Sequence, residues 1–310
     1  MKFSITIPSF KSRYLDEAIR SVVCQTYSDW ELIIVDDCSP EDIAGVVKPY
    51  LTDYRVRYYR NEKNCGAENV VDNWNICLNY CTGDYVICMG DDDVLLPCCL
   101  EEYRRCIDKH HDVDVVYGET AIIDESSKMI KSSSEHPEWE SVYDFMLNLW
   151  KGRDLFIGDV LIKTERLRSM GGYKSFPLAW GSDHVTTIMA GERNGIVSTD
   201  RVVFHYRQHS RTLSMSKTNL EAKLAADKAV FEWYKNFLDK ALTKDRETLC
   251  MLRKLRKRLP FQRNIRFALD LAEASPHQPL EIIKNYKKNK RYGMNLCTLL
   301  FAFYCSFRKP

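Results

Sequence analysis

The segment YVICMGDDDVLLP, residues 85–97, runs from apolar and β-branched residues into three consecutive acids, Asp91, Asp92 and Asp93. Adjacent carboxylates repel one another and lose solvation when a chain folds around them. A cation such as Mg²⁺ or Mn²⁺, which prefers oxygen ligands, would remove that repulsion. The segment therefore predicts a strand that ends either in a metal-binding loop or in a solvated acidic loop.

Strand-like and helix-like segments alternate along the first ~120 residues. The expected strands lie within residues 3–10, 30–40, 56–64, 84–93 and 112–125, and the expected helices within 14–27, 66–81 and 97–110. Alternation of this kind predicts an α/β fold with a mostly parallel, Rossmann-like sheet and helices on both faces. Ligands of such sheets bind outside the carboxyl ends of the strands. Because Asp36-Asp37 and Asp91–Asp93 both follow apolar strands, we expect them to share one edge of the sheet.

The chain changes character towards its C-terminus. Residues 251–310 contain 14 Lys and Arg against 3 Asp and Glu, a balance of +11, whereas the net charge of the whole chain is +2. We expect a main domain over residues 1–215 and a helical, basic extension over 216–310. The basic charge favours an anionic partner such as a membrane surface, or it is a solvated helix face. MNLCTLLFAFYCSF, residues 294–307, is too short for a spanning helix and predicts either an interfacial helix or a packed terminal one.

The first residues, MKFSITIPSF, resemble a strand and not a signal peptide. The 12 cysteines are therefore expected in a reducing cytoplasm, as free and mostly buried thiols. They include no C-x-x-C pair, so neither a zinc site nor a disulfide framework is expected.

Five segments, ITIPSF, ELIIVDDCSP, NCGAENVVDNW, YVICMGDDDVLLP and GGYKSFPLAWGSD, occur in an order and spacing that resemble the family 2 glycosyltransferases. The resemblance covers about residues 1–215. It implies the GT-A fold, with a nucleotide-sugar half over about 1–125 and an acceptor half over about 126–215. It also implies inverting transfer in bacterial polysaccharide synthesis, with Mn²⁺ or Mg²⁺ and a nucleotide-sugar donor, for which a UDP-sugar is the first expectation. The acceptor would be a saccharide or a lipid-linked saccharide at the inner face of the cell membrane.

The same resemblance assigns a nucleotide pocket. Its expected residues come from four segments: Pro8, Ser9, Phe10 and Arg13; Asp36 and Asp37; Asn64 and Gly66; Asp91 and Asp92. Asp37, with Asp36 beside it, would contact the base, although a turn or helix cap after the strand is the alternative. Asp91 or Asp92 would contact the ribose, and Asp93 would be the principal metal ligand, with Asp91 as a second candidate. Gly90 stands where relatives often carry the first acid of this motif.

Asp183, in WGSDHV, is the expected general base, because a carboxylate beside the acceptor site suits deprotonation of a hydroxyl. Ser182 replaces the acid that relatives carry next to it. The alternative for Asp183 is a helix cap or a first-turn acid. Trp180 would stack on an acceptor sugar or belong to the core.

Basic residues alternate in HYRQHSRTLS, at His205, Arg207, His209 and Arg211, which places them on one face of a strand. By resemblance, Arg207 would pair with phosphate oxygens, and His209 would contact phosphate or complete the metal shell. The alternative is an exposed basic edge strand.

Three other functions compete with the transferase. The missing acids at Gly90 and Ser182 leave open a non-catalytic nucleotide-sugar-binding protein or a scaffold of an assembly complex. A nucleotidyltransferase would carry a glycine-rich loop after the first strand, which IPSFKSRYLDEAI lacks. No nucleic-acid-binding motif accompanies the basic tail, so no nucleic-acid partner is expected.

Overall fold

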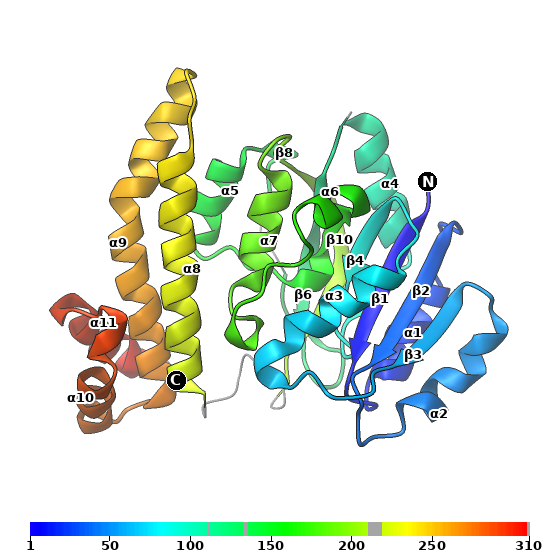
Figure 1. Cartoon of the computed structure of the whole chain (residues 1–310), viewed down its shortest axis with the longest axis horizontal. Coiled ribbons are helices and arrows are strands. Elements are labelled where there is room, and N and C mark those ends of the chain that lie inside the picture. Colours follow the sequence, from blue (N-terminus) through cyan, green and yellow to red (C-terminus); the bar gives the residue numbers. More distant parts are fainter. Residues whose placement is uncertain (111, 133–135, 210–218, 309–310) are drawn as a thin grey trace. The chain divides into compact units, whose positions relative to one another are not determined.

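The computed structural model describes residues 1–110, 112–132, 136–209 and 219–308, and it divides into two compact units (Figure 1). Unit 1 contains residues 1–175 and 182–209. Unit 2 contains residues 176–181 and the described helices from residue 219 onward. The predicted boundary after residue 215 falls outside the described residues, as does Arg211.

Unit 1 is built on one mixed sheet, whose described strands follow the order β3-β2-β1-β4-β9-β6-β10-β5, with β7 beside β6 and β8 beside β10. The strands are β1 (Phe3–Ser9), β2 (Trp30–Asp36), β3 (Val56–Arg60), β4 (Tyr85–Cys88), β5 (Val94–Leu95), β6 (Val115–Ile123), β7 (Met129–Ser132), β8 (Trp139–Glu140), β9 (Val160–Lys163) and β10 (Ile196–Arg207).

The predicted parallel arrangement is found in the first four strands, β3, β2, β1 and β4, and again between β6 and β10. Between these two groups lies β9, which is antiparallel to both β4 and β6. The α/β fold class is confirmed, and the insertion of β9 makes the sheet mixed.

Helices cover both faces of this sheet, as predicted. The helices of unit 1 are α1 (Leu15–Val23), α2 (Ile43–Val47), α3 (Val70–Tyr80), α4 (Cys99–Lys109), α5 (Val142–Leu149), α6 (Thr164–Ser169) and α7 (Ser182–Gly191). Alternate strand residues such as Ile5, Ile7 and Ile34 share one core with α1, α2 and α4. α3 packs on the opposite face of β1 and β2. This core holds the central strands rigidly and so fixes where their ends lie.

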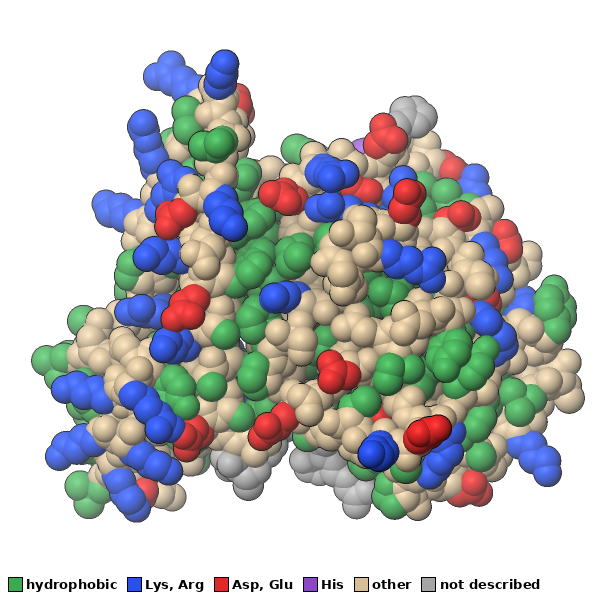
Figure 2. All heavy atoms as spheres, in the orientation of Figure 1, with side chains coloured by type: hydrophobic (Ala, Val, Ile, Leu, Met, Phe, Trp, Pro, Cys, Tyr) green, Lys and Arg blue, Asp and Glu red, His purple; other side chains and the backbone are tan. Residues whose placement is uncertain are grey.

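Unit 2 is helical and consists of α8 (Leu220–Lys240), α9 (Arg246–Ala274), α10 (Pro279–Lys288) and α11 (Leu296–Arg308), together with the short turn Pro177–Ala179. Its core joins Leu224, Phe267, Ile282 and Ala302 from all four helices. Lys and Arg side chains are prominent on its surface (Figure 2). α9 continues through Pro260, although proline removes one helical hydrogen bond. No helix in the described residues has the length and apolarity needed to cross a membrane.

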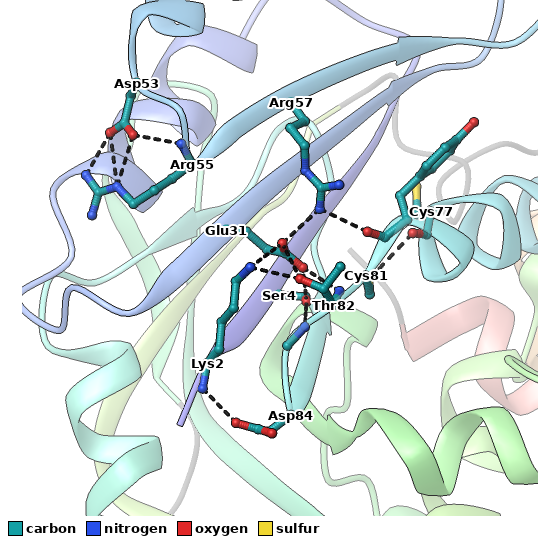
Figure 3. Close-up of polar contacts among 12 residues, drawn as sticks. Lys2, Ser4, Glu31, Asp53, Arg55, Arg57, Cys77, Cys81, Thr82 and Asp84 are labelled. Carbon is teal, nitrogen blue, oxygen red and sulfur yellow. Dashed lines mark hydrogen bonds and ion pairs between the residues drawn. The ribbon is translucent and has the colours of Figure 1, made fainter.

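A buried carboxylate, Glu31, ties the amino ends of the strands together (Figure 3). It accepts hydrogen bonds from Lys2 Nζ at 2.7 Å, Ser4 Oγ at 2.6 Å, Arg57 Nη2 at 2.8 Å and the backbone N–H of Thr82 at 2.6 Å. Burial alone would raise the pKa of Glu31, but hydrogen bonds from Lys2, Ser4 and Thr82 outweigh it and lower the pKa to about 2. This network lies at the opposite end of the strands from the acidic loop.

The described cysteines are all free. Cys77, Cys81, Cys88, Cys99 and Cys106 are buried, and burial raises the pKa of Cys88 to about 12. Such thiols act as small apolar side chains. Cys24, Cys250 and Cys297 are exposed, and the sequence did not indicate which cysteines would be.

Candidate active site

The ends of four strands meet at the carboxyl edge of the sheet. Ser9, the last residue of β1, is the register partner of Asp36 on β2, and the N–H of Asp37 donates to the Ser9 carbonyl at 2.9 Å. Asp91–Asp93 connect β4 to β5. Because β5 pairs with β10, this acidic loop also lies beside the end of β10. The structure thus brings the predicted acidic segments to one edge.

Asp91 fixes the loop that follows β1. Its Oδ2 accepts hydrogen bonds from the backbone N–H groups of Phe10 and Lys11, both at 2.7 Å. Burial, with the charge of Asp92 added, raises the pKa of Asp91 to about 6. A buried acid therefore holds the segment that the sequence assigns to the nucleotide pocket.

Asp93 is also buried, and it joins the acidic loop to β10. Its Oδ1 accepts the N–H of Arg207 at 3.0 Å, and its Oδ2 accepts the N–H of Gly90 at 3.3 Å. Burial and the neighbouring charge of Asp92 raise its pKa well above the ordinary value. A cation would relieve this accumulation of negative charge.

Gly90 has no room for a side chain. A Cβ atom there would lie 2.7 Å from Asp92 Oδ1 and 2.8 Å from Asp93 Oδ2. Relatives often carry an acid at this position, whereas here the backbone of Gly90 lies close to the carboxylates of Asp92 and Asp93. A fourth acid at this position would collide with them.

Asp92 contacts the end of β10 through both its side chain and its carbonyl. Its Oδ2 lies 2.7 Å from His209 Nε2, and its carbonyl accepts Arg207 Nε at 2.8 Å. The His209 ring also lies against Tyr14, with 5.6 Å between ring centroids. His209 is thus beside the acidic loop, as predicted. Its roles as a phosphate contact or metal ligand stay predictions.

The guanidinium of Arg207 is completely buried and surrounded by protein atoms. Nη2 donates to Glu17 at 2.8 Å, and Nη1 donates to Ser127 Oγ at 2.8 Å and to the Asp124 carbonyl at 3.2 Å. The group also lies 4.5 Å from the centroid of the Tyr14 ring. These contacts tie the helix after β1 to the ends of β6 and β10. The phosphate contact assigned to Arg207 stays a prediction.

Asp36 and Asp37 organise the turns that follow β2 and β3. Asp36 is fully buried, pairs with Arg60, and accepts the N–H of Ser39 at 2.7 Å. Asp37 accepts Asn61 Nδ2 at 2.8 Å and the N–H of Cys65 at 3.0 Å. The turn-forming role that the sequence left open is therefore present. The base contact of Asp37 stays a prediction.

The remaining pocket residues lie on the same edge. Asn64 Nδ2 donates to the Asp37 carbonyl at 2.7 Å, and Gly66 has φ +83°, a conformation that favours glycine. Pro8 and Ser9 end β1, and the buried Ser9 hydroxyl has no hydrogen-bond partner among the described residues. Phe10 is 42% exposed, and Arg13 pairs with Glu125 at 3.2 Å.

Asp183 lies in the first turn of α7, which begins at Ser182. It is half-buried, and its Oδ1 accepts the N–H of His184 at 2.8 Å. The structure thus places Asp183 as a first-turn acid. This position leaves its second oxygen for other partners, and its role as a base stays a prediction.

The sequence did not point to Asp159, a buried acid whose charge interacts with those of Asp93 and Asp183. Asp159 is fully buried and accepts Thr120 Oγ1 at 2.9 Å and the N–H of Phe156 at 3.2 Å. Burial raises its pKa well above the ordinary value, and the charges of Asp183 and Asp93 act in the same direction. Asp159 is therefore a buried acid on which the charges of both Asp93 and Asp183 act. In the sequence Asp159 is a single acid directly before the apolar strand β9, and such an acid does not point to a site.

Asn75 was also missed, because it directly follows the segment NCGAENVVDNW that carries the resemblance. Its side chain accepts the N–H of Tyr173 at 2.8 Å and donates to the Tyr173 carbonyl at 3.2 Å. A Cβ atom at Gly172 would lie 2.3 Å from Asn75 Oδ1. Gly172 therefore lets α3 hold the Gly-Gly segment after α6.

Trp180 belongs to unit 2. Lys223 Nζ and the Arg266 guanidinium both lie 4.4 Å from the centroid of its ring. This indole is engaged by two cations of α8 and α9. Stacking of Trp180 on an acceptor sugar stays a prediction.

The family model for glycosyl transferase family 2 matches residues 4–161, about half of the chain, and includes the ends of β1, β2 and β4. The chain belongs to glycosyltransferase family 2. Asp183 and the β10 end lie beyond the matched residues.

Two named proteins illustrate the similarity of this family 2 chain. It is 28% identical to EpsE of Bacillus subtilis over 169 residues, which are 53% of this chain and 56% of EpsE. It is also 28% identical to the poly(ribitol-phosphate) β-N-acetylglucosaminyltransferase TarS of Staphylococcus aureus over 114 residues, 36% of this chain and 20% of TarS. The chain thus spans about half of EpsE and a fifth of TarS.

Solved structures show the fold. The crystal structure of S. aureus TarS 1–349 in complex with UDP-GlcNAc matches with a TM-score of 0.68 at 16% identity. The match covers 99% of this chain and 92% of the TarS chain. A mannosyltransferase from Pyrobaculum calidifontis in complex with GDP-Man and Mn²⁺ has a TM-score of 0.56 at 14% identity and covers 98% and 84%. The predicted GT-A fold is confirmed.

The acidic loop fits a divalent cation in its donor chemistry. Asp91 and Asp93 are buried acids whose pKa values are raised by burial and by the neighbouring charge of Asp92, and their oxygens are the ligand type that Mg²⁺ and Mn²⁺ prefer. In the part of the chain that the structure describes, no group of three or more His, Cys, Asp or Glu side chains is arranged as a ready-made metal cluster. One or two carboxylates would suffice if donor phosphates and water supplied the remaining ligands.

Proposed function

We propose that this chain is an inverting, metal-dependent glycosyltransferase. It would move a sugar from a nucleotide-sugar donor to a saccharide or lipid-linked saccharide acceptor. The observation that carries the proposal is the convergence of Asp91–Asp93 with the loops after β1 and β2 at the carboxyl edge of the sheet. Ligands of α/β sheets bind at such edges, and family membership supplies the reaction class.

The loops at this edge would bind and orient the donor. Asp91 holds the Phe10–Lys11 backbone, and Asp37 holds the turn at Cys65, so both walls of the proposed nucleotide pocket are fixed by buried or nearly buried acids. A divalent cation held by Asp93, with Asp91 or His209 beside it, would stabilise the negative charge that develops on the leaving diphosphate. Asp92, whose carboxylate lies 2.7 Å from His209 Nε2, or Asp91 would contact the ribose.

Asp183 would act as the general base. In an inverting transfer the acceptor hydroxyl attacks C1 of the sugar from the side opposite the diphosphate. The new C1–O bond forms as the bond to phosphate breaks, the hydroxyl proton passes to Asp183, and the nucleoside diphosphate leaves. The charges of Asp93 and Asp183 both act on the buried Asp159, which supports the placement of base and donor in one region.

The similar structures support a nucleotide-sugar donor. TarS 1–349 was solved with UDP-GlcNAc, and the P. calidifontis mannosyltransferase was solved with GDP-Man and Mn²⁺. A UDP-sugar is the first donor to test, because the TarS structure has the higher TM-score of the two.

We further propose that the acceptor is a growing cell-surface polysaccharide and that the enzyme works in the cytoplasm, at the inner face of the membrane. TarS is a poly(ribitol-phosphate) β-N-acetylglucosaminyltransferase, so one relative glycosylates a polymer, which supports a polymeric acceptor. The basic unit 2 suits an anionic surface.

A donor panel combined with Asp183→Asn tests the proposal. UDP-, GDP- and dTDP-sugars are assayed with Mn²⁺ for thermal stabilisation and for release of the nucleoside diphosphate, and the anomeric configuration of any product is read by NMR. We expect one donor class to stabilise the wild type and Asp183→Asn equally. Turnover should fall at least about 100-fold in the variant, because a general base contributes that much or more.

The exposed surface acid Asp108 supplies the matched control, Asp108→Asn, which should keep wild-type turnover. Donor binding without turnover in the wild type would favour the non-catalytic alternative. Full turnover in Asp183→Asn, or a product with retained configuration, would refute the proposed mechanism.

A further inference from the structure

One face of α11 carries a stripe of large apolar side chains that the described structure leaves exposed. Leu296, Leu300, Tyr304 and Phe307 are 65%, 60%, 54% and 63% exposed. They follow one another at spacings of four, four and three residues, which places them on one side of an α-helix. We call these four residues the α11 stripe.

The opposite side of α11 is packed against unit 2, so the helix is held in place. Thr298 and Ala302 are fully buried and Ser306 is 2% exposed. Thr298 Oγ1 lies 3.2 Å from Asn264 Oδ1 of α9, and Ala302 belongs to the core of unit 2. The α11 stripe is therefore presented outward by a docked helix.

Cations precede the α11 stripe in the chain. Lys284, Lys287, Lys288, Lys290 and Arg291 are exposed, and the acids paired with them are Glu221 and Glu281. Positive side chains gather over the α10–α11 end of unit 2 in Figure 2. Apolar side chains beside an excess of Lys and Arg match a surface that is negatively charged outside and apolar beneath.

We propose that α11 docks unit 2 onto an anionic lipid bilayer, with the α11 stripe inserted among the headgroups and the cations of residues 284–291 on the lipid phosphates. Because α11 has 13 residues, it is about 20 Å long, which suits a helix lying in the membrane plane. This proposal deepens the membrane-face location in the proposed function, but it does not require any donor chemistry.

A second copy of this chain fits the surface less well. Stable interfaces bury about 800 Å² per partner through 20–30 residues, whereas the α11 stripe has four. Two copies would also bring together surfaces with the same positive excess, which opposes association. The bilayer is therefore the occupant that charge complementarity favours.

Vesicle flotation of the full chain tests the proposal. The wild type should bind vesicles with 30% phosphatidylglycerol and should bind pure phosphatidylcholine far more weakly. The double variant Leu300→Ser, Phe307→Ser should bind the anionic vesicles at least about tenfold more weakly, because it removes two inserted side chains. Leu242→Ser is the matched control, because Leu242 is 96% exposed and lies between α8 and α9.

Three further measurements keep the outcome decisive. Hydrogen exchange of the wild type should show vesicle-dependent protection of residues 296–308 without any substitution. Equal flotation of the double variant, or no protection of that segment, would overturn the proposal. If light scattering finds a wild-type dimer that dissociates in the double variant, the α11 stripe binds a second copy of the chain and not a bilayer. Donor-induced thermal stabilisation in the double variant reports separately on the proposed function.

Discussion

Gly90 illustrates how one missing side chain shapes the candidate site. Its N–H donates to Asp93, and its Cα faces the carboxylates of Asp92 and Asp93 so closely that a methyl group would push both aside. Its φ lies outside the range that excludes other residues, so alanine is acceptable to the backbone there. The restriction at Gly90 is therefore one of space beside two functional acids.

We predict that Gly90→Ala weakens Mn²⁺-dependent binding of the nucleoside diphosphate about tenfold or more, while the free energy of unfolding falls by about 1–3 kcal/mol, as for other small overpacking changes. Calorimetric titration and urea unfolding measure the two effects. Unchanged affinity in a folded Gly90→Ala variant would show that the positions of Asp92 and Asp93 do not matter for binding.

The sequence predicted which residues gather at the site better than it predicted what each one contacts. Asp91–Asp93 were recognisable because three acids after an apolar strand are unusual. The burial of Arg207 was not, because its partners Glu17 and Ser127 lie far away in the chain. Asp159 was missed for a related reason, since a single acid before a strand carries no local signal.

At the scale of secondary-structure elements, Glu31 links β1, β2 and β3 with the segment before β4. Because its pKa is lowered to about 2, from an ordinary value of 4.5, its contribution to stability is complete above pH 4.5 and is lost as the pH falls towards 2. Between pH 6 and pH 3 this single group should account for about 2 kcal/mol of lost unfolding free energy.

We predict that Glu31→Gln is less stable than the wild type at pH 7 by about 2–3 kcal/mol and loses less stability between pH 6 and pH 3. Urea unfolding at the two pH values measures both quantities. Glu165→Gln, which changes an exposed acid in the first turn of α6, serves as the control. An unaltered pH dependence in Glu31→Gln would contradict the role assigned to this carboxylate.

Element positions followed well from the alternation of apolar strands and helices, but strand pairing did not. The expected strand at 112–125 became β6, yet β9 lies between it and β4 in the sheet. Strand pairing depends on partners distant in the chain, such as Ile87 and Leu161, which no local pattern reports. The continuation of α9 through Pro260 likewise reflects tertiary packing that outweighs a local preference.

At the scale of the whole molecule, charge and fold divide along similar lines. Unit 1 carries the acidic edge and the family 2 match, whereas the helices of unit 2 hold the basic excess. Composition predicted the basic excess towards the C-terminus. It did not predict that residues 176–181 join unit 2, because the contact of Gly181 with Val230 depends on helix packing. These six residues directly precede α7 in the chain, and Asp183, the proposed base, follows them by two residues.

The most direct test of the central claim is calorimetric titration of UDP into the wild type and Asp93→Asn, each with Mn²⁺ and with a chelator. Asparagine keeps an oxygen for the N–H of Arg207 or Gly90 but removes the charge, and Asp108→Asn controls for the substitution itself. We predict that Mn²⁺ tightens UDP binding at least about tenfold in the wild type and in Asp108→Asn, and has no effect in Asp93→Asn. Equal metal dependence in all three proteins, or none in the wild type, would contradict the claim that the acidic loop holds a cation against the donor diphosphate.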